Sequence, residues 1–199
     1  MSRFVALLLL GGAVPLAAQG AAPRVYHLAP DSRLEVETGK AGLLGFAGHS
    51  HIIRATRFSG TVHYAAHDPA ATTIAITILT DGLEVLTPPD TAEIRKVTAS
   101  MRDDVLHVAQ YPEISFTSTH VKPAGSGYKV TATLTMHGTT RELTVPVAVE
   151  FQGDTLVARG RFSVKQTDYG IRPFRGGPGG TVRVADEVKF RVEARALPE

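Results

Sequence analysis

The chain of 199 residues contains no cysteine and no tryptophan, and only 7% of its residues are aromatic. Without cysteine there are no disulfide bonds, thiolate nucleophiles or thiolate metal ligands, so the core alone must stabilise the fold. Acidic and basic residues nearly balance, with a formal net charge of +2. No cluster of Lys and Arg interleaves with aromatic residues, a pattern that is typical of nucleic-acid interfaces. Nucleic acid is therefore excluded as a partner.

Motifs of the common hydrolases are also missing. The sequence has no G-x-S-x-G nucleophile motif, no H-E-x-x-H zinc motif and no pair of carboxylates in a recognisable context. We therefore expect a binding protein rather than an enzyme. A metal-dependent hydrolase is the alternative, and its support would have to come from the histidines considered below.

Long apolar runs are confined to the amino terminus. Arg3 is followed by an apolar run over residues 4–16 and then by small residues up to Ala22. This order is typical of a secretory signal peptide, and we expect cleavage between residues 18 and 22. The apolar run is shorter than the roughly 20 residues that span a bilayer, and an uncleaved anchor is the alternative. The sequence thus predicts a signal peptide over residues 1–22, one domain over residues 23–199, and a periplasmic or secreted protein.

Most of the remaining chain has the period of β-strands. Val130, Ala132, Leu134 and Met136 share one face of a segment whose other face is threonine. The loop 137–141 contains Gly138 and predicts a hairpin to the next segment. In all, the pattern predicts strands over residues 33–38, 58–65, 72–80, 83–86, 114–121, 128–136, 142–151, 155–165 and 187–196.

One segment has a helical period instead. Up to Val108 the apolar residues recur every three to four positions, whereas Ile114 and Phe116 alternate with polar residues. Pro112 disfavours helical geometry at Tyr111, so local sterics set the break. The sequence predicts one short α-helix over residues 91–108.

Many short strands without strand–helix alternation predict an all-β sandwich or barrel. Closure into a barrel removes exposed strand edges, so we favour an antiparallel β-barrel with one short α-helix. A barrel of about eight strands either fills its interior with side chains or holds one small ligand. The inward-facing residues are aliphatic, which suits either a packed core or an apolar lumen. The pattern alone favours the packed core.

Six fragments in order resemble the YceI-like family. They are YHLAPDSRL at 26–34, FSGTV at 58–62, YPEISFTS at 111–118, LTMHGTTR at 134–141, TDYGI at 167–171 and VADEV at 184–188. The first fragment matches loosely, because Ser32 falls one place early. The resemblance implies a secreted, lipocalin-like antiparallel barrel that holds a polyisoprenoid or another long-chain lipid for transport, storage or stress protection.

The residues expected to line such a lumen combine one-face alternation with a place in the family-like strands. His137 is expected mainly as a hairpin residue, with contact to a ligand head group as its second role. The predicted ligand-binding residues are Val36, Phe58, Ile76, Ile78, Met101, Phe116, Leu134, Met136, Val145, Val147, Phe162, Phe190 and His137.

His49 and His51 form an H-x-H pair that an extended strand would point to one side. Zinc and copper sites use this spacing and need a third ligand. The alternative is a polar rim that hydrogen-bonds a ligand head group or water. We favour the rim and expect no metal cofactor. Candidate third ligands are His107, His137, Glu35 and Glu37.

The expected partner is therefore a long-chain lipid or isoprenoid. A transient contact with the membrane and a homodimer stay open. The sequence names neither the lipid nor the physiological role of its binding.

Overall fold

The computed structural model describes residues 22–41, 50–86, 91–176 and 181–199. The predicted signal peptide falls almost wholly on residues 1–21 and His49 on 42–49, so both predictions lie outside the described residues. In the described part of the chain, no helix has the length and apolar character needed to cross a bilayer.

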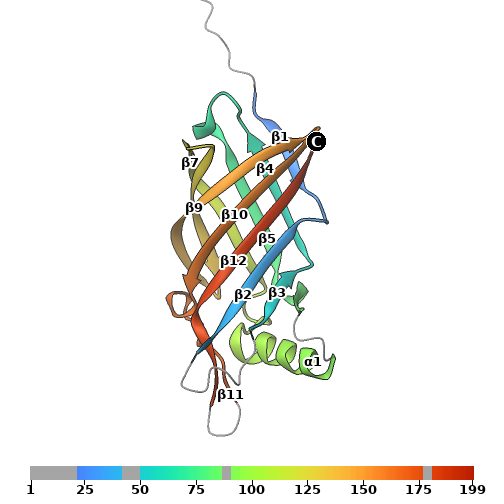
Figure 1. Ribbon diagram of the computed structural model, residues 1–199, viewed down its shortest axis with the longest axis vertical. Coiled ribbons are helices and arrows are strands. Elements are labelled where there is room, and N and C mark those ends of the chain that lie inside the picture. Colours follow the sequence, from blue (N-terminus) through green and yellow to red (C-terminus); the bar gives the residue numbers. More distant parts are fainter. Residues whose placement is uncertain (1–21, 42–49, 87–90, 177–180) are drawn as a thin grey trace, which may run out of the picture.

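The chain folds into an antiparallel barrel (Figure 1). The strands follow one another around the sheet in the order β1-β4-β5-β7-β8-β9-β10-β12-β2-β3-β6, and pairing of β1 with β12 closes it. Their bounds are β1 Arg24–Leu28, β2 Arg33–Ala41, β3 Ile52–Ala55, β4 Phe58–Tyr64, β5 Thr73–Leu79, β6 Leu83–Val85, β7 Glu113–Ala124, β8 Gly127–Met136, β9 Thr139–Gln152, β10 Thr155–Lys165, β11 Arg175–Gly176 and β12 Val182–Pro198.

The barrel wall has eight strand positions, because three of these positions are each occupied by a bent strand in two halves: β1 with β2, β3 with β4, and β5 with β6. β1 and β2 both pair with β12, β3 and β4 pair with β2 and β1, and β5 and β6 pair with β4 and β3. A hydroxyl bridges each bend. Ser32 Oγ donates to the Arg195 carbonyl at 3.0 Å, Thr56 Oγ1 to the Gly82 carbonyl at 2.8 Å, and Thr80 Oγ1 to the Tyr111 carbonyl at 2.9 Å. These bonds replace ladder bonds that the bends interrupt.

The predicted strands are confirmed with shifted ends, whereas β1, β3 and β11 were not predicted. They are only two to five residues long, too short to show a clear period of two. On β8, Val130, Ala132, Leu134 and Met136 are all buried, as predicted. The β8–β9 hairpin has a two-residue turn in which His137 and Gly138 both have positive φ, at 51° and 72°. That conformation is typical of the type I′ turn that suits the twist of a hairpin.

The helix is shorter than the predicted 91–108. α1 spans Thr91–Ser100, and a π-helical turn follows over Met101–Val105, where the Leu106 amide donates to the Met101 carbonyl at 2.9 Å. His107 then adopts a positive φ of 46°, which ends the helical geometry. The apolar period continues past this point, so periodicity alone could not locate the end.

α1 and β3 lie toward one end of the barrel and the C-terminus lies at the other (Figure 1). We call these the α1 end and the far end. The β8–β9 hairpin turn belongs to the α1 end, and the β7–β8 and β9–β10 turns belong to the far end. Large side chains pack at the far end around Tyr26, which is fully buried.

Candidate ligand cavity

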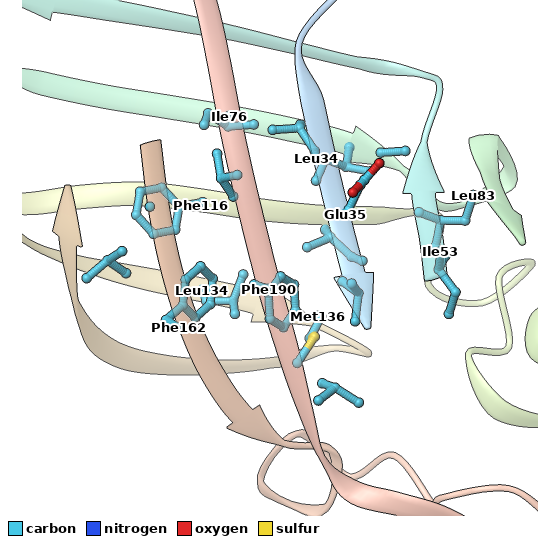
Figure 2. Close-up of a pocket in the computed structure, with 18 of the residues that line it drawn as sticks. Leu34, Glu35, Ile53, Ile76, Leu83, Phe116, Leu134, Met136, Phe162 and Phe190 are labelled. Atoms are coloured by element: carbon cyan, nitrogen blue, oxygen red, sulfur yellow. The ribbon is translucent and has the colours of Figure 1, made fainter. Parts of the chain in front are cut away.

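A cavity of about 780 Å³ occupies the barrel interior (Figure 2). Its volume is within the range of roughly 300–1,000 Å³ that is usual for small-molecule sites. Aliphatic and aromatic side chains make up most of its lining, and they come from strands around the whole barrel and from α1. Protein cores are normally packed without voids much larger than a water molecule, so a space of this size is not an ordinary packing defect.

The cavity exists because bulky and small residues are distributed unevenly around its wall. Phe162 and Phe190 pair across β10 and β12 and stack with ring centroids 4.6 Å apart and planes within 5°. Farther along the same two strands, Ala158 pairs with Ala194 and both face the cavity. Two small residues opposite each other leave space that a packed core would fill.

Gly160 lies between these two pairs. A Cβ there would come within 3.2 Å of a Val145 methyl group on β9. β9 and β10 stop pairing at this point, because Val147–Gly160 is their last pair toward the α1 end. Pro146 lies just beyond that pair and has no amide hydrogen to donate. The β9–β10 pairing has already ended there, so the proline costs it no hydrogen bond.

Most residues predicted to contact ligand are brought together around the cavity. The structure places Val36, Ile76, Ile78, Met101, Phe116, Leu134, Met136, Val145, Val147, Phe162 and Phe190 in its lining. Phe58 is outside that set and packs instead against the cluster of Leu34, Ala55, Leu83, Val85 and Met101. His137 also lies outside the lining, in the β8–β9 turn. That these residues contact a ligand stays a prediction.

Among the polar lining residues the sequence singled out His51, as part of a rim or metal pair, and Glu35, as a candidate metal ligand, but not the others and none of the small ones. Ala158 and Ala194 follow the same inward alternation as Phe162 and Phe190, so the alternation could have identified them. The polar lining residues gather at the two ends. At the α1 end they are Thr38, His51, Lys96, Ser100, Gln166 and Arg183, and toward the far end they are Tyr64, Thr72 and Tyr128. Glu35 also lines the cavity, and its carboxylate pairs with Arg54 at 2.6 Å (Figure 2).

Comparison with known proteins decides the family. A family model described as the YceI-like domain matches residues 31–196, which is most of the chain. The chain belongs to the YceI-like family. The fold is that of a YceI-like barrel, and such a barrel is consistent with binding a hydrophobic ligand.

Curated relatives of this YceI-like chain match over part of its length. The proteins named Protein YceI from Escherichia coli O17:K52:H18 and from Salmonella arizonae are 34% and 31% identical to it over 97 residues. That stretch is 49% of this chain and 48% of each relative, so the match spans about half the length of these relatives.

Solved structures share the fold of the YceI-like domain. The crystal structure of Burkholderia cenocepacia BcnA has a TM-score of 0.67 and 22% identity, covering 82% of this chain and 95% of that one. The Campylobacter jejuni YceI protein has a TM-score of 0.55 and 15% identity, covering 74% and 84%. At these identities the similarity shows the fold.

Turn residues from three of the YceI-like fragments, Tyr111, His137 and Gly170, meet at the α1 end beside the cavity lining. The Tyr111 ring centroid is 4.1 Å from that of His137, and a Cβ on Gly138 would come within 2.8 Å of the Tyr111 ring. Gly170, at φ 71°, lies on the other side of His137, where a Cβ would be 3.7 Å from Nδ1. The three turns therefore pack around the His137 imidazole. This packing leaves no room for a Cβ at Gly138.

Burial lowers the pKa of His137, and the nearby His107, with ring centroids 5.6 Å apart, lowers it further, while a backbone hydrogen bond to Tyr169 opposes both. His137 Nε2 is buried and has no hydrogen-bond partner among the described residues. A folded-state pKa below the ordinary value means that folding disfavours the protonated ring. The contribution of His137 to stability is therefore complete above its ordinary pKa and is lost as pH falls below it.

His51, the described half of the predicted H-x-H pair, lines the cavity at the α1 end. Its backbone amide donates to Thr38 Oγ1 at 3.1 Å. No group of three or more histidine and carboxylate side chains that could hold a metal is found within the described ranges. His49 lies outside those ranges, so the polar rim stays the prediction at this pair and zinc or copper stays its alternative.

Proposed function

We propose that this protein binds one long-chain apolar molecule, an isoprenoid or a similar amphiphile, in the barrel lumen. It acts by binding and carries or stores the molecule without catalysing a reaction. The observation that supports the proposal is the continuous 780 Å³ cavity with an apolar lining. A packed structural barrel would have filled that space with its own side chains.

The energetics suit a long chain. Burial stabilises each methylene by about 0.8 kcal/mol, so a chain of a dozen carbons gains about 10 kcal/mol before the cost of association. The binding free energy therefore accumulates along the chain, without need of a strong polar contact. Val130, Leu134 and Met136, on the inward face of β8, form one such apolar track.

Native mass spectrometry tests this proposal directly. We expect the protein as purified to carry one lipid per chain, and organic extraction to remove that mass. The extracted and refolded protein should then bind a long-chain isoprenoid alcohol at a ratio of one to one. A protein that carries no lipid and takes up neither isoprenoids nor fatty amides would contradict the proposal.

We also propose that the protein works in the periplasm or outside the cell, since a lipid carrier is needed where a chain must cross water between membranes. Amino-terminal sequencing of protein recovered from the periplasm should give a new terminus after residue 18 to 22. Recovery of intact Met1 in the cytoplasm would contradict this localisation. Transient membrane contact and a homodimer remain predictions that fit the same role.

A further inference from the structure

Three tyrosines gather toward the far end of the cavity. Tyr64 and Tyr128 line it, with their hydroxyl oxygens 3.2 Å apart. Tyr26 lies close by in the wall, is fully buried, and its hydroxyl has no hydrogen-bond partner among the described residues. We call Tyr26, Tyr64 and Tyr128 the tyrosine cluster. Phenylalanine at these positions would fill the same space without placing polar atoms in it.

The hydroxyls of the pair are not fully used. A hydroxyl-to-hydroxyl bond usually has oxygens 2.5–3.0 Å apart, so the 3.2 Å pair is loosely bonded. One hydroxyl donates to the other, which leaves one hydroxyl hydrogen without an acceptor among the described residues. Thr72 also lines this end, and its hydroxyl oxygen accepts a hydrogen bond from the Ala65 amide at 3.1 Å. The Thr72 hydroxyl hydrogen has no acceptor among the described residues. Within the cluster the Tyr26 hydroxyl is fully buried without a partner among the described residues, and a buried unpaired polar group is costly. The cluster therefore offers hydroxyl hydrogens to an acceptor on a ligand.

The chemistry of that acceptor is limited by charge. Burial and the hydrogen bond to Tyr128 raise the pKa of Tyr64 to about 12, so Tyr64 stays a neutral donor. Lys96 and Arg183 are the cations in the described lining, and both belong to the α1 end. Arg24 lies over the Tyr26 ring at 5.5 Å, but its side chain is 60% exposed and paired with Asp154, so it does not enter the cavity. An anion beside the tyrosine cluster would therefore have no cation of the lining beside it, which is unfavourable. An uncharged oxygen meets no such penalty.

We propose that the tyrosine cluster binds an uncharged oxygen on the ligand, so that a ketone, quinone, alcohol or amide end group enters the cavity first. This inference rests on the proposed function. The apolar chain then extends past Phe116 and Leu134 toward α1. Tyr128 and Met136 are eight residues apart on β8, about 26 Å along the strand, which gives a long chain room behind its end group.

Phe151 supports this direction of entry. Its ring lies 5.4 Å from that of Tyr64 and 6.2 Å from that of Tyr26, although Phe151 itself is 45% exposed at the rim. It packs against the Tyr26 and Tyr64 rings in the inward register of β9. A ligand that enters from the far end would have to pass this ring, whereas one that enters from the α1 end would not.

Paired probes test the inference. A long-chain methyl ketone and the alkene of equal length are compared by displacement of a fluorescent fatty-acid probe. In the Tyr64→Phe, Tyr128→Phe double variant we expect about tenfold weaker binding of the ketone, the range of one or two neutral hydrogen bonds, and unchanged binding of the alkene. Tyr111→Phe, a tyrosine outside the cavity, is the matched control and should change neither.

The direction of entry has its own measurement, because the natural chain has no tryptophan. Phe151→Trp, at the rim, reports on the far end, and Phe174→Trp, at a cavity-lining position, reports on the α1 end. A ketone brominated in the head half of its chain, several carbons from the carbonyl so that it does not alkylate the protein, should quench Phe151→Trp more strongly than one brominated at the tail. The order should reverse for Phe174→Trp.

The outcomes separate the two proposals. If the natural protein binds neither ketone nor alkene, the proposed function fails. If it binds both, and the double variant weakens both equally or neither, the cavity binds chains but the tyrosine cluster does not recognise the oxygen. Stronger quenching of Phe151→Trp by the tail bromine would also overturn the inference.

Discussion

Replacing both Ala158 and Ala194 with phenylalanine should abolish tight binding of a long-chain ligand. The two residues pair across β10 and β12 and both face the cavity, so two rings would project into the lumen from adjacent strands. Excluding only four methylenes of a bound chain removes about 3 kcal/mol, which is more than a hundredfold in Kd. Because the rings enter existing space, the fold should tolerate them better than it would in a packed core.

The measurement is Kd by displacement of a fluorescent fatty-acid probe, with native mass spectrometry to count bound lipid. Ala148→Phe is the matched control, because Ala148 is exposed on the outward face of β9. This variant should bind the ligand with unchanged affinity. Thermal unfolding of each variant checks that the barrel is intact. Full affinity in a folded double variant would show that ligand binds outside this cavity.

Gly138→Ala should strongly destabilise the barrel. Gly138 has φ 72°, a conformation that costs a residue with a Cβ about 1–2 kcal/mol. The new methyl group would also come within 2.8 Å of the Tyr111 ring, and relieving that overlap should cost about 1–3 kcal/mol more. We expect the free energy of unfolding to fall by about 2–5 kcal/mol, measured by urea denaturation.

Gly153→Ala separates the two contributions. Gly153 has φ 62° in the β9–β10 turn, but a Cβ there would meet nothing within 4 Å. It should therefore lose only the conformational part, about 1–2 kcal/mol. The difference between the two variants measures the contact with Tyr111. Equal losses would show that the Tyr111 ring moves aside freely and that the three packed turns at the α1 end contribute little.

Local features of the chain were predictable from the sequence because they depend on near neighbours. The alternation on β8 gave its buried face, since successive strand residues point to opposite sides. Gly138 and Gly170 lie at positive φ as turn residues in their segments, and glycine pays no steric cost there. Pro112 correctly separated the helical segment from β7.

Features that depend on strand closure were not predictable in this way. The halves β1 and β3 are strands only because β12 and β2 lie beside them, and their residues carry too short a pattern to be recognised. The π-helical turn and the positive φ of His107 end the helix early, through bonds that periodicity does not encode. Phe58 is an aromatic residue on a predicted strand, as expected, yet its ring packs into the cluster beside the cavity.

The sequence by itself determined an antiparallel, cysteine-free β-barrel, the faces of its main strands and most of the residues that point inward. Only the tertiary structure decided between a packed core and a lumen, because empty volume depends on which side chains meet across strands. Ala158 and Ala194 are 36 positions apart, and Tyr64 and Tyr128 are 64 apart, and neither pair has a local signal. Periodicity assigns a residue to a face, whereas closure of the barrel assigns it a neighbour.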